Sequence, residues 1–251
     1  VIVGFGLQDV AEKTIFEYED IKGEALAVPV SNINPYLVDA PDLVLEKRNQ
    51  PICIVPTISY GSMANDDGHL LLDKEQRNAL IAAEPATAPY IRRYMGAQEF
   101  LNNAERWCLW LKDISPSLMR SSNELRHRIE AVRKFRASSN REATRNLAAT
   151  PSLFGEDRQP LKSYLLLPKV SSENRPYMPI GFMPSEVIAN GSALTISDSG
   201  HYEMGVLQSK MHMAWMRAVA GRMKSDYQYS AQIVYNNFPW PDIPEKLEPN
   251  Q

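Results

Sequence analysis

The chain has 251 residues, of which 44% are hydrophobic and 23% are charged, and its formal net charge is -3. This balance is typical of a folded protein and excludes an intrinsically disordered one. The sequence has no run of ~20 apolar residues that would span a bilayer and no basic segment followed by an apolar leader, so membrane and exported proteins are excluded and a cytoplasmic location is predicted.

The first sixty residues are predicted to form short strands and extended connections. Apolar runs at Val1–Phe5, Leu26–Val30 and Ile52–Tyr60 alternate with five prolines, which disfavour helices. Because the first run begins at Val1 and resembles a core strand, we expect the chain to be part of a longer protein.

The middle of the chain is predicted to alternate turns, helices and one strand. Asp73 and Thr87 are expected helix N-caps, and apolar residues spaced by three or four after Ser115 indicate an amphipathic helix. The predicted elements are an exposed turn at 65–69, a helix from 73 through 83, helices at 87–95 and 98–103, a strand at 106–111 and a long helix from 115.

The last third is predicted to contain three short strands, a long helix and a final strand. These lie at 164–170, 178–183, 193–196, 201–223 and 232–235. The methionines of the long helix are interpreted as core residues. The predicted fold class is therefore α+β, with mixed short β-strands and several helices.

Charge is distributed unevenly along the chain. Residues 1–75 hold 13 acidic and 5 basic side chains, whereas residues 118–148 hold 8 basic and 3 acidic ones. Lys134 is the only lysine among those eight, and the planar guanidinium of arginine matches phosphate oxygens well. This segment is either a phosphate-contacting surface or an ordinary solvated helix face.

Residues 224–228 carry a donor, an acceptor and an amide at alternate positions. In an extended chain Lys224, Asp226 and Gln228 would share one face. Lysine can donate to guanine, aspartate can accept from cytosine and glutamine can bridge adenine, so this triplet suits contact with base edges. The alternative is a loose surface ion pair between Lys224 and Asp226 that contributes little.

The remaining candidates for chemistry have simpler interpretations. Asn34-Pro35-Tyr36 resembles a base-holding methyltransferase loop but lacks one proline and is interpreted as a turn. Asp66, Asp67 and His69 suit a surface turn better than a metal site, and His201 and His212 are about three helical turns apart, too far for one metal. Cys53 and Cys108 are expected to be reduced thiols. We expect neither catalytic residues nor a metal site in this chain.

Several separate segments together resemble the C-terminal half of one enzyme family. They are 96–100 (Gly-Ala-Gln-Glu-Phe), 105–111 (Glu-Arg-Trp-Cys-Leu-Trp-Leu), 171–175 (Ser-Ser-Glu-Asn-Arg), 178–182 (Met-Pro-Ile-Gly-Phe), 211–217 (Met-His-Met-Ala-Trp-Met-Arg) and 235–241 (Tyr-Asn-Asn-Phe-Pro-Trp-Pro). From about residue 1 to 241 the chain resembles the MmeI-like N6-adenine DNA methyltransferases, which include type IIL restriction-modification enzymes and YeeA-like methylases.

The resemblance implies a DNA target recognition domain at 61–251, preceded at 1–60 by the end of a methyltransferase domain and its connecting strands. The site for S-adenosylmethionine would lie upstream, so this fragment would need no cofactor. The parent would be an adenine-N6 methyltransferase, with or without endonuclease activity. Its partners would be double-stranded DNA and its own methyltransferase domain, without a membrane.

The resemblance also implies roles for individual residues. Lys224 and Asp226 match positions that discriminate the base pair next to the methylated adenine, and Lys169 and Asn190 match positions that help recognise other pairs. With Gln228, these are the expected base contacts. Apart from the resemblance, the arginine-rich composition of 118–148 predicts contacts to the DNA backbone. The expected backbone contacts are Arg126, Arg133, Lys134, Arg136, Ser171, Ser172 and Arg175.

Two other classes of function remain open from the sequence. The basic segment would also suit a protein-interaction module that binds an acidic partner. A nuclease would need a cluster of carboxylates and lysine, which this sequence does not suggest. Binding of duplex DNA in the presence of a polyanion competitor would separate a DNA-recognition domain from a protein-interaction module.

Overall fold

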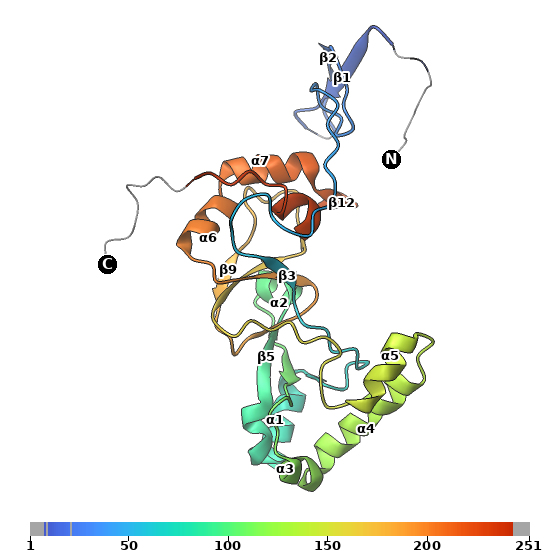
Figure 1. Cartoon of the computed structure of the whole chain (residues 1–251), viewed down its shortest axis with the longest axis vertical. Coiled ribbons are helices and arrows are strands. Elements are labelled where there is room, and N and C mark those ends of the chain that lie inside the picture. Colours follow the sequence, from blue (N-terminus) through green and yellow to red (C-terminus); the bar gives the residue numbers. More distant parts are fainter. Residues whose placement is uncertain (1–7, 9, 21, 243–251) are drawn as a thin grey trace, which may run out of the picture. The chain divides into compact units, whose positions relative to one another are not determined.

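A computed structural model describes residues 8, 10–20 and 22–242 (Figure 1). The chain divides into two compact units, Val1–Arg48 and Asn49–Gln251. The strand expected at Val1–Phe5 lies outside the described residues.

The first unit is built on an antiparallel hairpin of β1 (Lys13–Glu17) and β2 (Leu26–Val30). β2 confirms the strand predicted for the apolar run Leu26–Val30. Beyond the hairpin, the buried Asn34 accepts hydrogen bonds from the backbone amides of Tyr36 (2.9 Å) and Val38 (3.3 Å). Asn34-Pro35-Tyr36 is therefore the turn that the sequence predicts, because its amide oxygen is occupied by its own backbone.

The second unit contains three small sheets. The first has the order β10 (Ile188–Ala189), β5 (Ile91–Met95), β6 (Trp107–Leu109) and β4 (Leu71–Leu72). The second is antiparallel throughout, in the order β3 (Ile58–Tyr60), β11 (Ala193–Ser197), β7 (Tyr164–Pro168) and β9 (Gly181–Met183). The third, which we call the recognition sheet, joins β12 (Gly221–Met223), β13 (Asp226–Gln228) and β8 (Val170–Ser171).

Seven α-helices are described around these sheets. They are α1 (Lys74–Ala83), α2 (Ala97–Asn102), α3 (Pro116–Ser121), α4 (Asn123–Ala137), α5 (Glu142–Asn146), α6 (His201–Leu207) and α7 (Lys210–Val219). Short 3₁₀ segments η1 (Pro85–Tyr90) and η2 (Leu147–Ala149) and a π-helical turn η3 (Ala231–Tyr235) complete the unit. The mixed α and β architecture confirms the predicted fold class.

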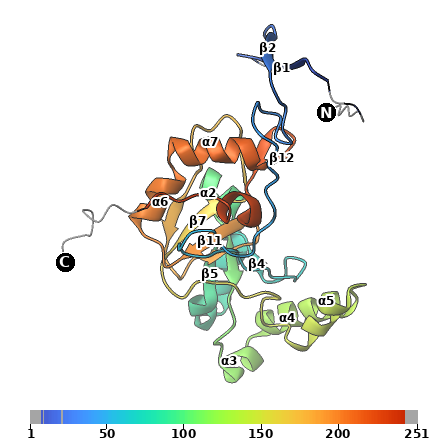
Figure 2. The same cartoon turned by 45° about the horizontal axis from the view of Figure 1, so that its top comes forward.

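Most of the helices gather at opposite ends of the second unit, whereas α2 lies in the middle. In Figures 1 and 2, α6 and α7 lie at one end and α3, α4 and α5 at the other, with β7 and β11 between them. One apolar core surrounds β6 and the buried face of α4, including Leu109, Leu125 and Val132. A second core lies under α7 and includes Met213 and Met216, as predicted. The same prediction is wrong for Met211 and Met223, which are more than half exposed.

Local signals predict α1 correctly. Asp73 accepts a hydrogen bond from the amide of Gln76 at 2.8 Å, and the Gln76 side chain accepts from the Asp73 amide at 3.1 Å, which completes a capping box. The turn predicted at 65–69 is also present, with Asn65, Asp67 and Gly68 at positive φ.

Four other predicted elements are wrong or incomplete. One differs because strand pairing overrides local propensity, and three differ because a serine begins a new helical segment. The helix expected at 87–95 is instead η1 followed by β5, which pairs with β6 and β10. The helix expected from Ser115 breaks at Ser122, whose hydroxyl accepts from the Leu125 amide at 3.0 Å and so begins α4.

The C-terminal elements differ for a similar reason. Ser209 caps α7 by accepting from the His212 amide at 3.1 Å, which divides the long predicted helix at 201–223 in two, and its last three residues form β12. The strand expected at 232–235 is the π-helical turn η3, which Ser230 caps through the Ile233 amide.

Arg136 is fully buried at the end of α4, and all five of its guanidinium N–H groups have an acceptor. Nε donates to the carbonyl of Asn65, Nη1 to those of Leu147 and Thr150, and Nη2 to those of Ala64 and Leu153, at 2.7–3.0 Å. Burial lowers the pKa of Arg136, and the nearby Asp66 opposes this shift. The side chain thus holds the segments 64–65 and 147–153 against α4.

Arg136→Met should destabilise the protein by about 3 kcal/mol or more, because it leaves five carbonyl oxygens without their donor in a buried site. Urea unfolding followed by tryptophan fluorescence would measure the change. Arg133→Met, on the exposed side of the same helix, should stay within about 0.5 kcal/mol of the unsubstituted protein. Equal stabilities for the two variants would contradict the assigned role of Arg136.

Candidate nucleic-acid interface

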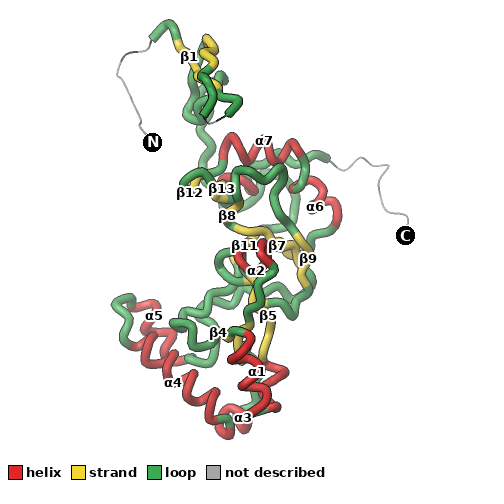
Figure 3. The backbone as a smooth tube through the Cα atoms, turned by 180° about the vertical axis from the view of Figure 1, so that it is seen from behind, coloured by secondary structure: helices red, strands yellow, loops and turns green. Residues whose placement is uncertain are grey.

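The recognition sheet brings together strands from two distant parts of the sequence, β8 and the β12–β13 hairpin (Figure 3). β13 pairs with β12 through Met223 and Asp226, and with β8 through Tyr227↔Ser171 and Gln228↔Val170. Two of the expected base contacts, Asp226 and Gln228, therefore lie beside the strand that follows Lys169.

Alternation along β13 sets which side chains leave the core. Tyr227 is buried at 5% exposure and packs in the second core, whereas its neighbours Asp226 and Gln228 are half-buried. Because successive side chains of a strand point to opposite faces, Asp226 and Gln228 share the face away from Tyr227.

Lys224 does not continue that strand. It occupies the two-residue turn between β12 and β13 with φ +58°, a left-handed conformation that non-glycine residues rarely adopt. Arg222 holds this turn, since its guanidinium donates to the Ser225 carbonyl at 3.0 Å and lies 3.9 Å from the centre of the Tyr227 ring. The extended chain predicted for 224–228 is thus a hairpin, with an exposed lysine at its tip.

Lys169 connects the recognition sheet to the loop that carries Asn190. Its amide donates to the Ser192 carbonyl at 3.0 Å, and its carbonyl accepts from the Tyr229 amide at 2.8 Å. The ammonium of Lys169 lies 5.1 Å from the centre of the Tyr60 ring, within cation–π distance. Ser192 also hydrogen-bonds to the side chain of Asn190, so it links the two predicted base contacts Lys169 and Asn190.

Asn190 is held in a fixed orientation beside a groove of about 380 Å³. Its Oδ1 accepts from the amide (2.8 Å) and the hydroxyl (2.6 Å) of Ser192. A Cβ at Gly96 would lie 2.1 Å from Asn190 Nδ2, and one at Gly61 would lie 2.2 Å from the Asn190 carbonyl oxygen. Sequence reasoning missed both glycines, although Gly96 opens one of the motifs that carry the family resemblance.

The basic segment presents part of its charge to solvent. Arg126, Arg133 and Lys134 are exposed on α4. Arg126 donates to Asn123 at 2.5 Å, and Arg133 lies 3.6 Å from Glu130. In Figures 1 and 3, α4, α5 and β12 all lie toward one side of the second unit. β12 is at the end that carries α7, whereas α4 and α5 are at the opposite end.

Two of the residues expected to contact the DNA backbone, Arg136 and Ser171, are buried, so these two predictions are wrong. Arg136 is buried, with every donor used inside the protein, so it has none left for a phosphate. Ser171 is buried in β8 at 3% exposure, because it pairs opposite Tyr227 on the core side of the sheet. Ser172 and Arg175 are half-buried in the loop that follows β8.

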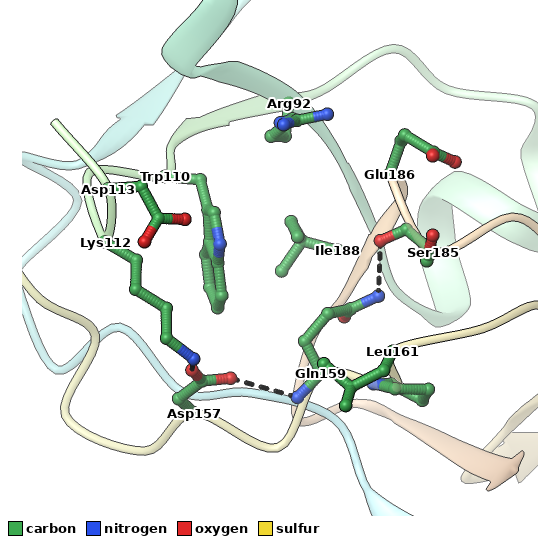
Figure 4. Close-up of a pocket in the computed structure, with 11 residues that line it drawn as sticks. Arg92, Trp110, Lys112, Asp113, Asp157, Gln159, Leu161, Ser185, Glu186 and Ile188 are labelled. Carbon is green, nitrogen blue, oxygen red and sulfur yellow. Dashed lines mark hydrogen bonds and ion pairs between the residues drawn. The ribbon is translucent and has the colours of Figure 1, made fainter.

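A second pocket, of about 270 Å³, lies between β5, the segment 110–113 after β6, the segment 157–161 and the start of β10 (Figure 4). Lys112 pairs with Asp157 at 2.8 Å on one side of it. The side-chain Nε2 of Gln159 donates to the carbonyls of Ser185 and Val187, which ties two segments together. Lys112, Asp157 and Gln159 are thus occupied in holding the fold.

The expected turn at Asp66 is not a metal centre among the described residues. Asp66 is buried and accepts from the Leu70 amide at 2.6 Å, and no group of three or more metal-ligating side chains occurs in 8, 10–20 and 22–242. Cys53 and Cys108 are both free thiols.

His212 lies beneath the recognition sheet and is fully buried. Its Nε2 is 3.0 Å from the Tyr229 hydroxyl, its ring packs edge-on against Phe238, and its Nδ1 has no partner among the described residues. Burial lowers the pKa of His212 to about 4. The ring is therefore neutral at pH 7, and its burial against Phe238 and its contact with Tyr229 make it part of the packing under the sheet.

The free energy of unfolding should fall as the pH is lowered from about 6.5 to 4, because the unfolded chain binds a proton that the folded His212 excludes. Above pH 6.5 this histidine is neutral in both states, so the stability it contributes is fully present. The loss of free energy of unfolding reaches about 3 kcal/mol once the pH is below 4. Chemical unfolding at several pH values would show a shallower dependence in His212→Phe. Parallel pH profiles for the two proteins would refute the burial of an uncharged histidine.

Comparisons with known proteins match this region closely. A family model described as the MmeI target recognition domain matches residues 39–242. DNA methyltransferase A of Bacillus subtilis (strain 168) is 37% identical over 244 residues, which are 97% of this chain and 27% of that protein. The chain thus spans about a quarter of this curated relative.

A solved structure of the type IIL restriction-modification enzyme MmeI in complex with DNA superposes with a TM-score of 0.91 at 45% identity. The match covers 96% of this chain and 32% of that one. None of the helices in the described residues is both long and apolar enough to cross a membrane.

Proposed function

The chain belongs to the family of the MmeI target recognition domain, and on this premise we propose that it recognises a specific sequence in duplex DNA on behalf of a larger enzyme. The observation that carries the proposal is the recognition sheet. Its pairing of β13 with β8 gathers Lys169, Asp226 and Gln228 beside the exposed turn at Lys224.

These groups have the chemistry needed to distinguish base pairs. In a major groove, an ammonium donates to guanine O6 and N7, and a carboxylate accepts from the N4 amino group of cytosine. We assign Lys224 and Asp226 to one G·C pair, and Lys169, Asn190 and Gln228 to neighbouring pairs. Oδ1 of Asn190 is occupied by Ser192, so this residue would act through its Nδ2 donor.

Contacts to the DNA backbone are assigned to exposed side chains of α4. Arg126, Arg133 and Lys134 would bind phosphates and set the position of the duplex, while the recognition sheet would supply sequence preference. Ser172 and Arg175, in the loop after β8, are assigned to the backbone next to the recognised bases.

We propose that the whole protein is an adenine-N6 DNA methyltransferase of the cytoplasm, with S-adenosylmethionine as methyl donor bound upstream of this chain. Asn34 is occupied by its own turn and makes no candidate for the catalytic asparagine. The methyltransferase domain is proposed to end within 1–60, and the recognition domain to occupy 61–251. Residues 49–60 already belong to the second unit, since β3 pairs with β11.

The first unit has a surface suited to contact with that upstream domain. Phe16, Tyr18 and Leu26 are each more than half exposed around the β1–β2 hairpin. A two-stranded hairpin with exposed apolar side chains is marginally stable alone, which supports packing against another domain.

The family match and the DNA-bound relative favour DNA recognition as the function over a protein-interaction module with an acidic partner.

Lys224→Glu combined with Asp226→Arg, in the full-length protein, should reverse the preferred base pair at one position of the recognised site. Each well-placed base contact contributes about 1 to 3 kcal/mol of discrimination, so the preference should change by roughly tenfold or more. Sequencing of DNA for methylated adenine after exposure to each protein would measure this preference.

A matched control is the exposed pair Lys162 and Asp198, whose charged groups lie 3.8 Å apart away from the recognition sheet. Lys162→Glu with Asp198→Arg should leave the methylated sequence unchanged. An unaltered preference in the Lys224 and Asp226 variant would remove the basis for assigning these residues to base contacts.

Arg133→Ala combined with Lys134→Ala should weaken binding to all DNA sequences alike. Each lost phosphate contact lowers the slope of log affinity against log salt by about 0.9, so the double variant should lose roughly 1 to 2 from this slope. Dissociation constants at several salt concentrations, on duplexes with and without the recognised site, would test it. A loss confined to the recognised site would assign these residues to base contacts instead.

A further inference from the structure

A basic groove of about 240 Å³ lies between α7 and the loop after β8, lined by Pro176, Tyr177, Lys210, Met213 and Arg217. We propose that this groove binds the sugar–phosphate backbone of the DNA that the recognition sheet contacts. This inference rests on the proposed function and adds a second phosphate-binding surface, separate from α4.

The charge of the groove comes from two cations on one face of α7. Lys210 and Arg217 are seven residues apart, which is about two helical turns and ~10 Å of rise. Both are exposed, and neither side chain forms an ion pair or hydrogen bond within the described residues. Because both side chains are long, their charged ends can converge on one phosphate or contact two neighbouring ones.

The surrounding sequence contains little to neutralise these cations. Residues 204–225 include no aspartate or glutamate, while they hold Lys210, Arg217, Arg222 and Lys224. In the opposite wall, residues 172–177 hold one carboxylate, Glu173, against Arg175. Nε of Arg175 is buried and has no partner among the described residues. The groove thus has an excess of positive charge that a polyanion would complement.

Both walls of the groove continue directly into the recognition sheet. The loop 172–177 follows β8, and α7 leads through Ala220 into β12. A phosphate in the groove would therefore be held by the same segments that carry the base-contacting residues. This connection favours the DNA backbone over a free anion, because a backbone phosphate here would fix the register of the duplex on β13.

The Tyr177 side chain adds a neutral donor. It is 41% exposed at the groove, and its hydroxyl has no hydrogen bond within the described residues. Tyrosine hydroxyls commonly donate to phosphate oxygens in protein–DNA interfaces. Two cations and one hydroxyl thus converge on a concave surface beside the recognition sheet.

The test is Lys210→Ala combined with Arg217→Ala in the full-length protein. Affinity for duplex DNA should fall by about tenfold or more, and the slope of log affinity against log salt should decrease by roughly 1 to 2. The loss should be equal for duplexes with and without the recognised site, and the methylated sequence should not change. Lys210→Arg combined with Arg217→Lys keeps both charges and should retain the affinity and the salt slope. Lys162→Ala, on another surface, should also retain both.

Three outcomes would overturn the inference. The first is that the Ala variant binds duplex DNA with the same affinity and salt slope as the unsubstituted protein. The second is that inorganic phosphate binds the unsubstituted protein but not the Ala variant in calorimetric titration, while the salt slope for DNA is the same in both. That result would assign the groove to a free anion. Failure of the unsubstituted protein to bind duplex DNA at all would reject the proposed function, and this inference with it.

Discussion

The pairing of β13 with β8 is the interaction on which the candidate interface depends. It consists of two residue pairs, extended by the hydrogen bond from the Tyr229 amide to the Lys169 carbonyl. Lys169 and Gln228 are almost sixty residues apart in the sequence, and this pairing is what brings their segments together. So short a ladder contributes little by itself, since isolated small sheets are marginal in water. Its stability must come from the side chains beneath it.

Those side chains form a compact aromatic layer. Tyr227 and Tyr229 are both buried below the sheet, and His212 contacts Tyr229 from α7. Burial of aromatic rings supplies the largest apolar area per residue. The same helix that closes this layer carries Lys210 and Arg217 on its exposed side. Packing of the sheet and placement of positive charge are therefore two consequences of where α7 lies.

The positive charges of this chain serve opposite purposes depending on their surroundings. Arg136 is enclosed by five carbonyl oxygens and stabilises the fold. Arg133, three residues earlier, is exposed and beside only Glu130. Composition counts the two equally, which is why the sequence assigned both to phosphate contact. Burial of a guanidinium is tolerated only where all its donors are satisfied, and that condition depends on loops more than ten residues away.

Local chemistry made some elements predictable. The capping box at Asp73 and the β-branched and apolar run of β2 act within a few residues of each other, so the chain pattern alone was sufficient. The alternation of Asp226 and Gln228 about Tyr227 was predictable in the same way. The partner strand β8 was not, because pairing depends on a segment outside any local window. Lys210 and Arg217 were overlooked because they occur in a helix whose methionines drew attention to its core side.

The hairpin separates the residues that anchor it from the residues proposed to contact bases. Tyr227 points into the core and anchors β13, whereas Asp226 and Gln228 leave it, and Lys224 occupies an exposed turn. Substitutions at exposed positions usually change stability by less than about 0.5 kcal/mol, while a change of base-contacting group alters discrimination by about 1 to 3 kcal/mol. The turn is held by Arg222 through the Ser225 carbonyl, a contact that does not involve the side chain of Lys224. The groups that anchor the hairpin and the groups available to DNA are therefore different residues, so sequence preference can change while the supporting packing stays the same.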